Sequence, residues 1–138
     1  MESIKVVEHM DRHPVLLEAN MSLATAVDKL LQNKKLGAPV IDSSGALVGF
    51  LSQQDCLAVM LKSSYHCDLV ATVSDCMKTE VLTVTVDESV LQLAEQMLQN
   101  KPKIYPVLDG QKVVGTIDRT AVLQAINVSM QECYLAPV

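Results

Sequence analysis

The chain has 138 residues, of which 49% are hydrophobic and 3% aromatic, and its formal net charge is −5 at pH 7. The hydrophobic content argues against disorder, and the acidic balance argues against a nucleic-acid surface, which usually carries a basic stripe. The N-terminal residues lack the apolar core of a signal peptide, and no apolar run has the length of a membrane span. We therefore expect a cytoplasmic protein with no membrane partner.

The sequence pattern of the first half of the chain predicts short elements that are alternately helical and extended. Apolar residues at helical spacing follow Ser22, a typical N-cap residue, and indicate an amphipathic helix. Two continuous apolar stretches then flank a turn rich in Ser, Asp and Gly, which predicts a pair of strands. The expected elements are a helical turn at 6–10, an extended segment at 15–17, a helix from 22 that fades at 33–35, strands at 38–41 and 47–51, and a helix from 52.

The same order of elements returns in the second half of the chain. Matching residues lie 67 positions apart, as in Met10 and Met77, Ser22 and Ser89, and Pro39 and Pro106. This period exceeds the roughly 20–50 residues of solenoid repeats, and one copy alone is too small to bury a full core. We therefore expect a mixed α+β fold in which two half-domains pack as one pseudo-two-fold unit. The expected boundaries are 1–62 for the first copy, 63–72 for a linker, 73–128 for the second copy and 129–138 for a C-terminal tail.

The repeats resemble the CBS (cystathionine-beta-synthase) domain family over residues 4–128. The shared marks are Val-x-Glu-x-Met at 6–10 with Val-x-Asp-x-Met at 73–77, a Ser before an apolar helix in each copy, Pro-Val-x-Asp at 39 and 106, and Gly-x-x-Ser-x-x-Asp at 49–55. The resemblance implies a small three-stranded sheet with two helices in each copy. It also implies clefts that bind AMP, ADP, ATP or S-adenosylmethionine in many members, a regulatory role toward a separate effector protein, and a homodimer formed through the paired domains.

The first copy carries the polar groups that a nucleotide cleft needs. In the family pattern the acid at the position of Asp55 binds the ribose hydroxyls, and an ionised carboxylate can accept two hydrogen bonds from a diol. The adjacent helix start offers N–H groups to phosphate oxygens. Spacing alone also fits a second interpretation, in which Ser52 is only an N-cap and Asp55 only a first-turn acid. The residues expected at this site are Gly37, Ala38, Pro39, Ser52 and Asp55, with Val15 and Leu16 as an apolar wall for the base.

The second copy departs from this pattern. Ala121 replaces Asp55 and cannot bind a diol, while Asp118 replaces Ser52 and its charge disfavours a nearby phosphate. Arg119 is either a phosphate contact or a solvated surface residue. We therefore expect one competent site per chain, in the first copy. The residues of the doubtful second cleft are Tyr105, Pro106, Asp118 and Arg119.

Other constellations give little support for a metal, a cofactor or catalysis. The four cysteines form no C-x-x-C pair, and the candidate ligands His9, His13, His66 and Cys67 do not form a standard set of four. The chain has no Gly-rich phosphate loop and no nucleophile motif, so we expect no enzyme activity. The matched cations Lys34, Lys35, Lys101 and Lys103 are either solvated helix ends or attract phosphate to the clefts. An alternative function is a structural or protein-interaction module with the same fold and no physiological ligand.

Overall fold

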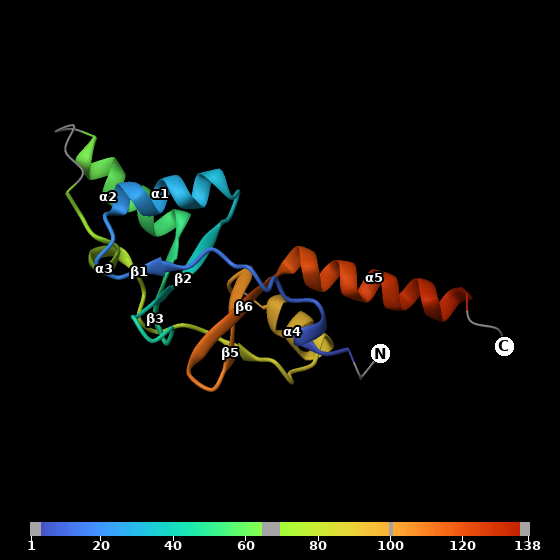
Figure 1. The fold of residues 1–138 in the computed structure, drawn as a ribbon. Helices are drawn as coiled ribbons and strands as arrows, with labels where there is room; N and C mark the ends of the chain where they lie inside the picture. Colours follow the sequence, from blue (N-terminus) through green and yellow to red (C-terminus); the bar gives the residue numbers. More distant parts are fainter. Residues whose placement is uncertain (1–3, 65–69, 100, 136–138) are drawn as a thin grey trace. The chain divides into compact units, whose positions relative to one another are not determined.

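The computed structural model describes residues 4–64, 70–99 and 101–135, which form a mixed α+β fold (Figure 1). Two three-stranded sheets have the strand orders β1-β2-β3 and β4-β5-β6. Within these ranges no helix is long and apolar enough to cross a membrane. The elements are η1 (Val6–Glu8), β1 (Leu17–Glu18), α1 (Leu23–Gln32), β2 (Gly37–Ile41), β3 (Leu47–Ser52), α2 (Gln53–Ser63), α3 (Val73–Cys76), β4 (Val84–Thr85), α4 (Val90–Met97), β5 (Ile104–Asp109), β6 (Lys112–Asp118) and α5 (Arg119–Leu135). The predicted fold class, with one small three-stranded sheet in each copy, is confirmed.

The chain divides into two compact units, and their limits differ from those of the sequence repeats. The β1–β3 unit contains residues 13–81 and 111–113, and the β4–β6 unit contains residues 1–12, 82–110 and 114–138. The opening segment of each repeat therefore belongs with the sheet of the other repeat. Val6 is buried in the core of the β4–β6 unit, and its repeat counterpart Val73 is buried in the core of the β1–β3 unit.

The β1–β3 unit is built around β2, whose residues 37–40 are all buried. β2 pairs in parallel with β1 and antiparallel with β3. Pro39 is tolerated in this central strand because β1 pairs only from Val40 onward, so the missing N–H leaves no gap in the ladder. Ser22 caps α1 as predicted, with its side chain accepting a hydrogen bond from the Thr25 N–H at 3.2 Å. α1 and α2 lie side by side in this unit (Figure 1).

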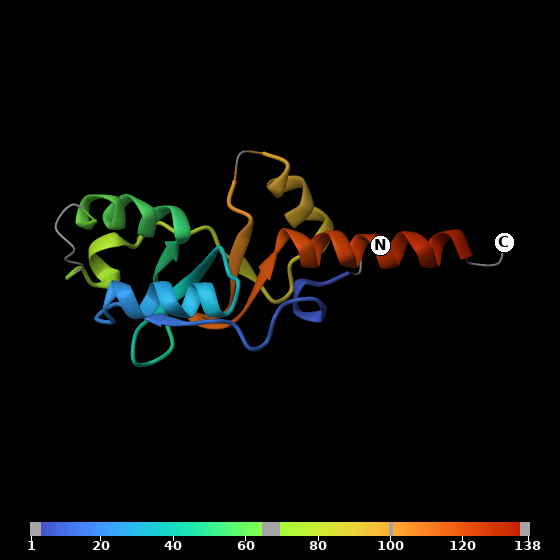
Figure 2. The same ribbon diagram turned by 90° about the horizontal axis from the view of Figure 1, so that it is seen from above.

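The β4–β6 unit has the long helix α5, which Figure 2 shows as one uninterrupted rod. Its start is capped by Asp118, whose Oδ1 accepts a hydrogen bond from the Ala121 N–H at 2.8 Å. α5 continues to Leu135, so the segment from 129, expected as a tail, is helical as far as that residue. The sequence contains neither Gly nor Pro between 119 and 135, and nothing in its composition ends the helix earlier.

Tyr105 occupies the centre of the β4–β6 core and offers a direct stability test. It is 0% exposed, and no described residue gives its hydroxyl a hydrogen-bond partner. Burial also raises the pKa of this phenol. An unsatisfied buried hydroxyl costs about 1–3 kcal/mol, so Tyr105→Phe should raise the free energy of unfolding by about 1 kcal/mol in urea titrations. A clear loss of stability in Tyr105→Phe would show that the hydroxyl is satisfied in solution.

Candidate functional site

A short strap formed by Met77 and Lys78 fixes one side of the candidate site in the β1–β3 unit. The Lys78 N–H donates to the Phe50 carbonyl at 2.9 Å, and the Phe50 N–H donates to the Lys78 carbonyl at 2.8 Å. The strap can lie this close because residue 49 is glycine. A Cβ there would lie 2.6 Å from Met77 Sδ and 2.9 Å from the Lys78 carbonyl oxygen. The backbone of Lys78 is therefore held against β3 by both hydrogen bonding and packing.

The start of α2 forms the other side of the site. The Asp55 N–H donates to Ser52 Oγ at 3.1 Å, which confirms the predicted N-cap. In return, Asp55 Oδ2 accepts hydrogen bonds from the Ser52 N–H at 3.1 Å and from Ser52 Oγ at 2.8 Å. The Gln53 N–H donates to the Leu36 carbonyl at 2.8 Å. Two of the first three N–H groups of α2 are thus engaged within the protein, so this helix start offers a phosphate fewer donors than the sequence suggested.

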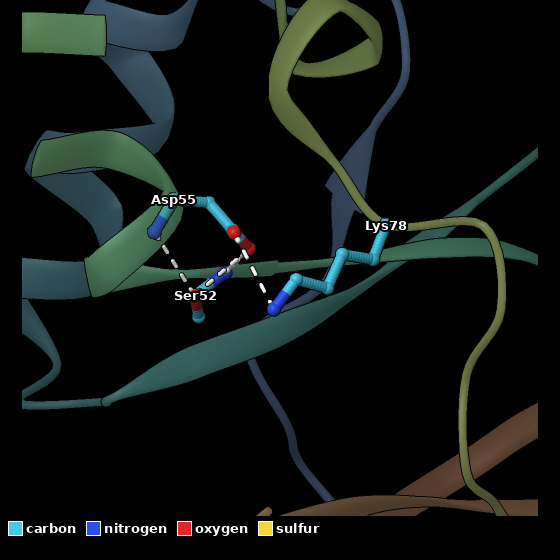
Figure 3. A network of polar contacts seen from close by, with 3 residues as sticks. All are labelled: Ser52, Asp55 and Lys78. Atoms are coloured by element: carbon cyan, nitrogen blue, oxygen red, sulfur yellow. Dashed lines mark hydrogen bonds and ion pairs between the residues drawn. The ribbon is translucent and has the colours of Figure 1, made fainter. Parts of the chain in front are cut away.

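The second carboxylate oxygen of Asp55 faces a cation. Figure 3 shows the Lys78 side chain extending across β3 toward Asp55, and its Nζ lies 3.7 Å from Asp55 Oδ1. The distance is that of an ion pair rather than a direct hydrogen bond. The Asp55 side chain is only 14% exposed, whereas that of Lys78 is 69% exposed. The site therefore combines a largely buried acid with a solvated cation.

Lys78 is the residue that the sequence interpretation missed. It lies in the opening segment of the second repeat, and the expected domain boundaries assigned it to the second copy. The alignment of the two repeats could have drawn attention to it, because Lys78 follows Met77 as Asp11 follows Met10. The two copies therefore differ in charge at this position. Only the fold, however, places Lys78 beside Asp55.

The other residues expected at the site lie in different surroundings. Gly37 is opposite Ser52 in the sheet, and a Cβ on it would lie 2.6 Å from Phe50 Cε1, so packing already accounts for this glycine. Ala38 is 1% exposed and belongs to the hydrophobic core, and Pro39 is also buried. Val15 and Leu16 are half-buried in the segment before β1, and Val15 packs against the core. Ser52, Asp55 and Lys78 are thus the polar side chains that the structure brings together.

An apolar groove of about 200 Å³ also lies in the β1–β3 unit, between α1 and α2. It contains none of the residues predicted to bind the nucleotide. Its lining is Val27, Leu30, Leu31, Gln53, Cys56, Leu57 and Met60. Burial raises the pKa of the Cys56 thiol to about 11, so the thiol stays protonated at neutral pH and is a poor nucleophile.

The β4–β6 unit repeats this scaffold with different charges. Asp11 takes the place of Lys78, and its backbone exchanges hydrogen bonds of 2.7 and 3.1 Å with Thr116. Gly115 makes room for it, since a Cβ there would lie 2.6 Å from the Asp11 carbonyl oxygen. Of the residues predicted for the doubtful second cleft, Asp118 caps α5, Arg119 is exposed, and Tyr105 and Pro106 are buried. The acid Asp11 therefore stands where the β1–β3 unit carries a cation.

The described part of the chain holds no group of three or more His, Cys, Asp or Glu residues that could bind a metal ion. His66 and Cys67 lie outside the described residues. Exposed Cys133 and buried Cys56 are free thiols.

Comparison with known proteins identifies the family. The CBS domain family matches residues 4–62 and 73–128, so the chain belongs to this family and carries two copies of its domain. The CBS domain-containing protein MJ0729 of Methanocaldococcus jannaschii is 31% identical over 118 residues, which cover 85% of this chain and 90% of that protein. The A-adding tRNA nucleotidyltransferase of Aquifex aeolicus is 28% identical over 130 residues, but these are only 15% of its length. The chain likewise spans 42% and 33% of two further curated relatives, so it matches only part of several larger proteins.

Solved structures agree with this assignment. The structure of CBSX2 in complex with AMP has a TM-score of 0.80 and 26% identity, and the match covers 92% of this chain and 98% of CBSX2. The AcuB protein of Vibrio cholerae has a TM-score of 0.83 and 28% identity, over 97% of this chain and 98% of AcuB. The tandem CBS pair predicted from the repeat is confirmed.

Proposed function

We propose that this protein is a regulatory module that binds an adenine nucleotide at the start of α2 in the β1–β3 unit. The observation that carries the proposal is the Asp55 carboxylate, which is 14% exposed, is oriented by Ser52 and faces a solvated ammonium group. Such a carboxylate suits a ribose diol, and the cation suits a phosphate. The similarity to CBSX2, whose structure contains AMP, supports the choice of ligand.

The proposed output is a shift between conformations rather than a chemical step. A nucleotide held by Asp55 and Lys78 would join the start of α2 to the strap, two segments that are 23 residues apart in the sequence (78 − 55). A ligand shifts a conformational equilibrium only by its difference in affinity for the two states, and joining two segments supplies such a difference. The signal would pass to a separate effector protein. The cytoplasmic location stays a prediction of the sequence.

The proposal is tested by thermal unfolding with AMP, ADP, ATP and S-adenosylmethionine. A ligand at about 100 times its Kd adds roughly 2.7 kcal/mol of stability, which should raise Tm by several degrees. At least one of the three nucleotides should produce this shift at millimolar concentration or below. A shift with none of the nucleotides, or with S-adenosylmethionine alone, would contradict the proposal.

A structural or interaction module without a physiological ligand is the second candidate function. It is favoured by the internal contacts of Asp55, because Ser52 donates two hydrogen bonds to Oδ2 and Lys78 forms an ion pair with Oδ1. Under this alternative Asp55 only stabilises the start of α2. The thermal-shift experiment separates the two functions.

We also propose that the protein forms a homodimer through its helices. Leucines at matching repeat positions are exposed in both units: Leu31 is 61% and Leu98 89% exposed, while Leu57 is 66% and Leu123 68% exposed. Leu31 and Leu57 line the same groove between α1 and α2, and exposed apolar side chains that lie together are typical of association surfaces. The expected result is a dimer mass in light scattering after size-exclusion chromatography, and a monomer mass for Leu57→Glu with Leu123→Glu. The exposed Lys62→Glu serves as the control, and a monomeric unmodified protein would contradict the proposal.

A further inference from the structure

Lys78 combines a backbone held by hydrogen bonds with a solvated head group. The strap holds its main chain through two hydrogen bonds to Phe50, whereas its side chain is 69% exposed. A lysine ammonium has three donors, and the ion pair with Asp55, at 3.7 Å, leaves Nζ open to solvent and to a second anion. The ammonium group thus stays beside Asp55 without losing its hydration, so the desolvation free energy is small.

The ion pair also controls access to Asp55. Oδ2 already accepts two hydrogen bonds from Ser52, so a ribose diol can approach the carboxylate only on the side of Oδ1, which faces Lys78. An ion pair with a solvated partner is weak, because water and salt compete for it. A ligand hydroxyl can therefore displace the ammonium from Oδ1, and the displaced group stays tethered beside the ligand.

The charge at this position is independent of the scaffold that presents it. The β4–β6 unit uses the same glycine, at Gly115, and the same pair of backbone hydrogen bonds, between Asp11 and Thr116, but presents a carboxylate. The lysine is thus not required for building the strap. This comparison within one chain points to a role for the charge itself.

We propose that Lys78 is a specificity-determining residue that selects ligands with a phosphate over neutral adenosyl compounds such as adenosine. The inference rests on the proposed function, since it concerns the same site. Asp55 binds the ribose that all these compounds share, and Lys78 distinguishes the phosphate that only the nucleotides carry. A purely structural lysine would change the affinity for both classes equally, because it would act only through the shape of the site.

The test is calorimetric titration of AMP and of adenosine into the intact chain and into Lys78→Met, which keeps most of the aliphatic side chain and removes the charge. In Lys78→Met the Kd for AMP should rise about tenfold, as expected for loss of one charge-assisted contact, while the Kd for adenosine should change less than about twofold. Raising the salt concentration should weaken AMP binding to the unmodified chain more than to the variant. Lys62→Met is the matched control. It also removes one positive charge, but Lys62 lies about 10 Å from Asp55 along α2, so the variant should alter neither Kd.

Equal changes for AMP and adenosine, or no change for either, would overturn the specificity role and leave the proposed function intact. Failure of the unmodified chain to bind either compound would overturn the role of Lys78, and the proposed function falls with it if ADP and ATP also give no thermal shift.

Discussion

Asp55→Ala should weaken AMP binding at least tenfold and lower the free energy of unfolding by about 1 kcal/mol. The loss of affinity follows if the carboxylate accepts hydrogen bonds from the ribose as proposed, since bonds to charged groups contribute about 1.5–3 kcal/mol each. The loss of stability follows from the capping box, because the Ser52 N–H and Oγ both donate to Asp55 Oδ2. Titration calorimetry measures the first effect and urea unfolding the second.

Asp75 provides the matched control for this variant. It forms the same capping box at α3, where its Oδ2 accepts hydrogen bonds from the Thr72 N–H at 2.8 Å and Thr72 Oγ1 at 3.1 Å. Asp75→Ala should therefore remove the capping carboxylate without weakening AMP binding. If both variants bind AMP as tightly as the unmodified chain, Asp55 is only a cap, as in the second interpretation of the sequence.

Gly49→Ala should destabilise the protein by about 1–3 kcal/mol, the usual range for overpacking a filled site. The new Cβ would lie 2.6 Å from Met77 Sδ and 2.9 Å from the Lys78 carbonyl oxygen. The methionine side chain can move, but the carbonyl belongs to the strap, so relief requires the strap to separate from β3. AMP binding should therefore weaken together with stability, because the strap carries Lys78.

Gly45→Ala is the control for a general effect of replacing glycine. Its φ of +87° makes an alanine strained, at about 1–2 kcal/mol, but beyond the adjacent residues no atom lies within 4 Å of the added Cβ. This variant should lose stability and keep its affinity for AMP. Equal loss of affinity in the two variants would mean that binding follows global stability rather than the position of the strap. Denaturant unfolding and calorimetry at a temperature where each variant is folded make the comparison.

Local patterns were sufficient to predict most of the helices and strands, and the repeated motifs indicated the family. The caps Ser22 and Ser52 lie where the sequence placed them, because capping depends on residues within one helical turn. The strands around residues 38–41 and 47–51 were likewise given by apolar stretches on either side of turn residues. The extent of α5 was underestimated, because the apolar residues near its C-terminal end show only a weak helical period. The segment contains no helix breaker before Leu135, so the helix continues to that residue.

The parts that were not predicted depend on contacts between distant residues. The exchange of opening segments between the repeats cannot be seen in a linear alignment, because both copies keep the same order of elements. For that reason Lys78 was not connected with Asp55. Gly37 was expected at the nucleotide site, whereas in the structure the ring of Phe50 lies against it. The sequence shows that a small residue occupies this position, but not which neighbouring side chain requires a small residue there.

The two units differ in the charges they carry at the site, and the stoichiometry of AMP binding tests most directly whether only the β1–β3 unit binds the nucleotide. The β1–β3 unit carries Asp55 and Lys78, whereas the β4–β6 unit carries Ala121 and Asp11 on the same scaffold. Calorimetric titration of the full chain with AMP should give one site per chain, and Asp55→Ala should remove it. Two equivalent sites per chain, or one site that is unaffected in Asp55→Ala, would contradict a single site at Asp55.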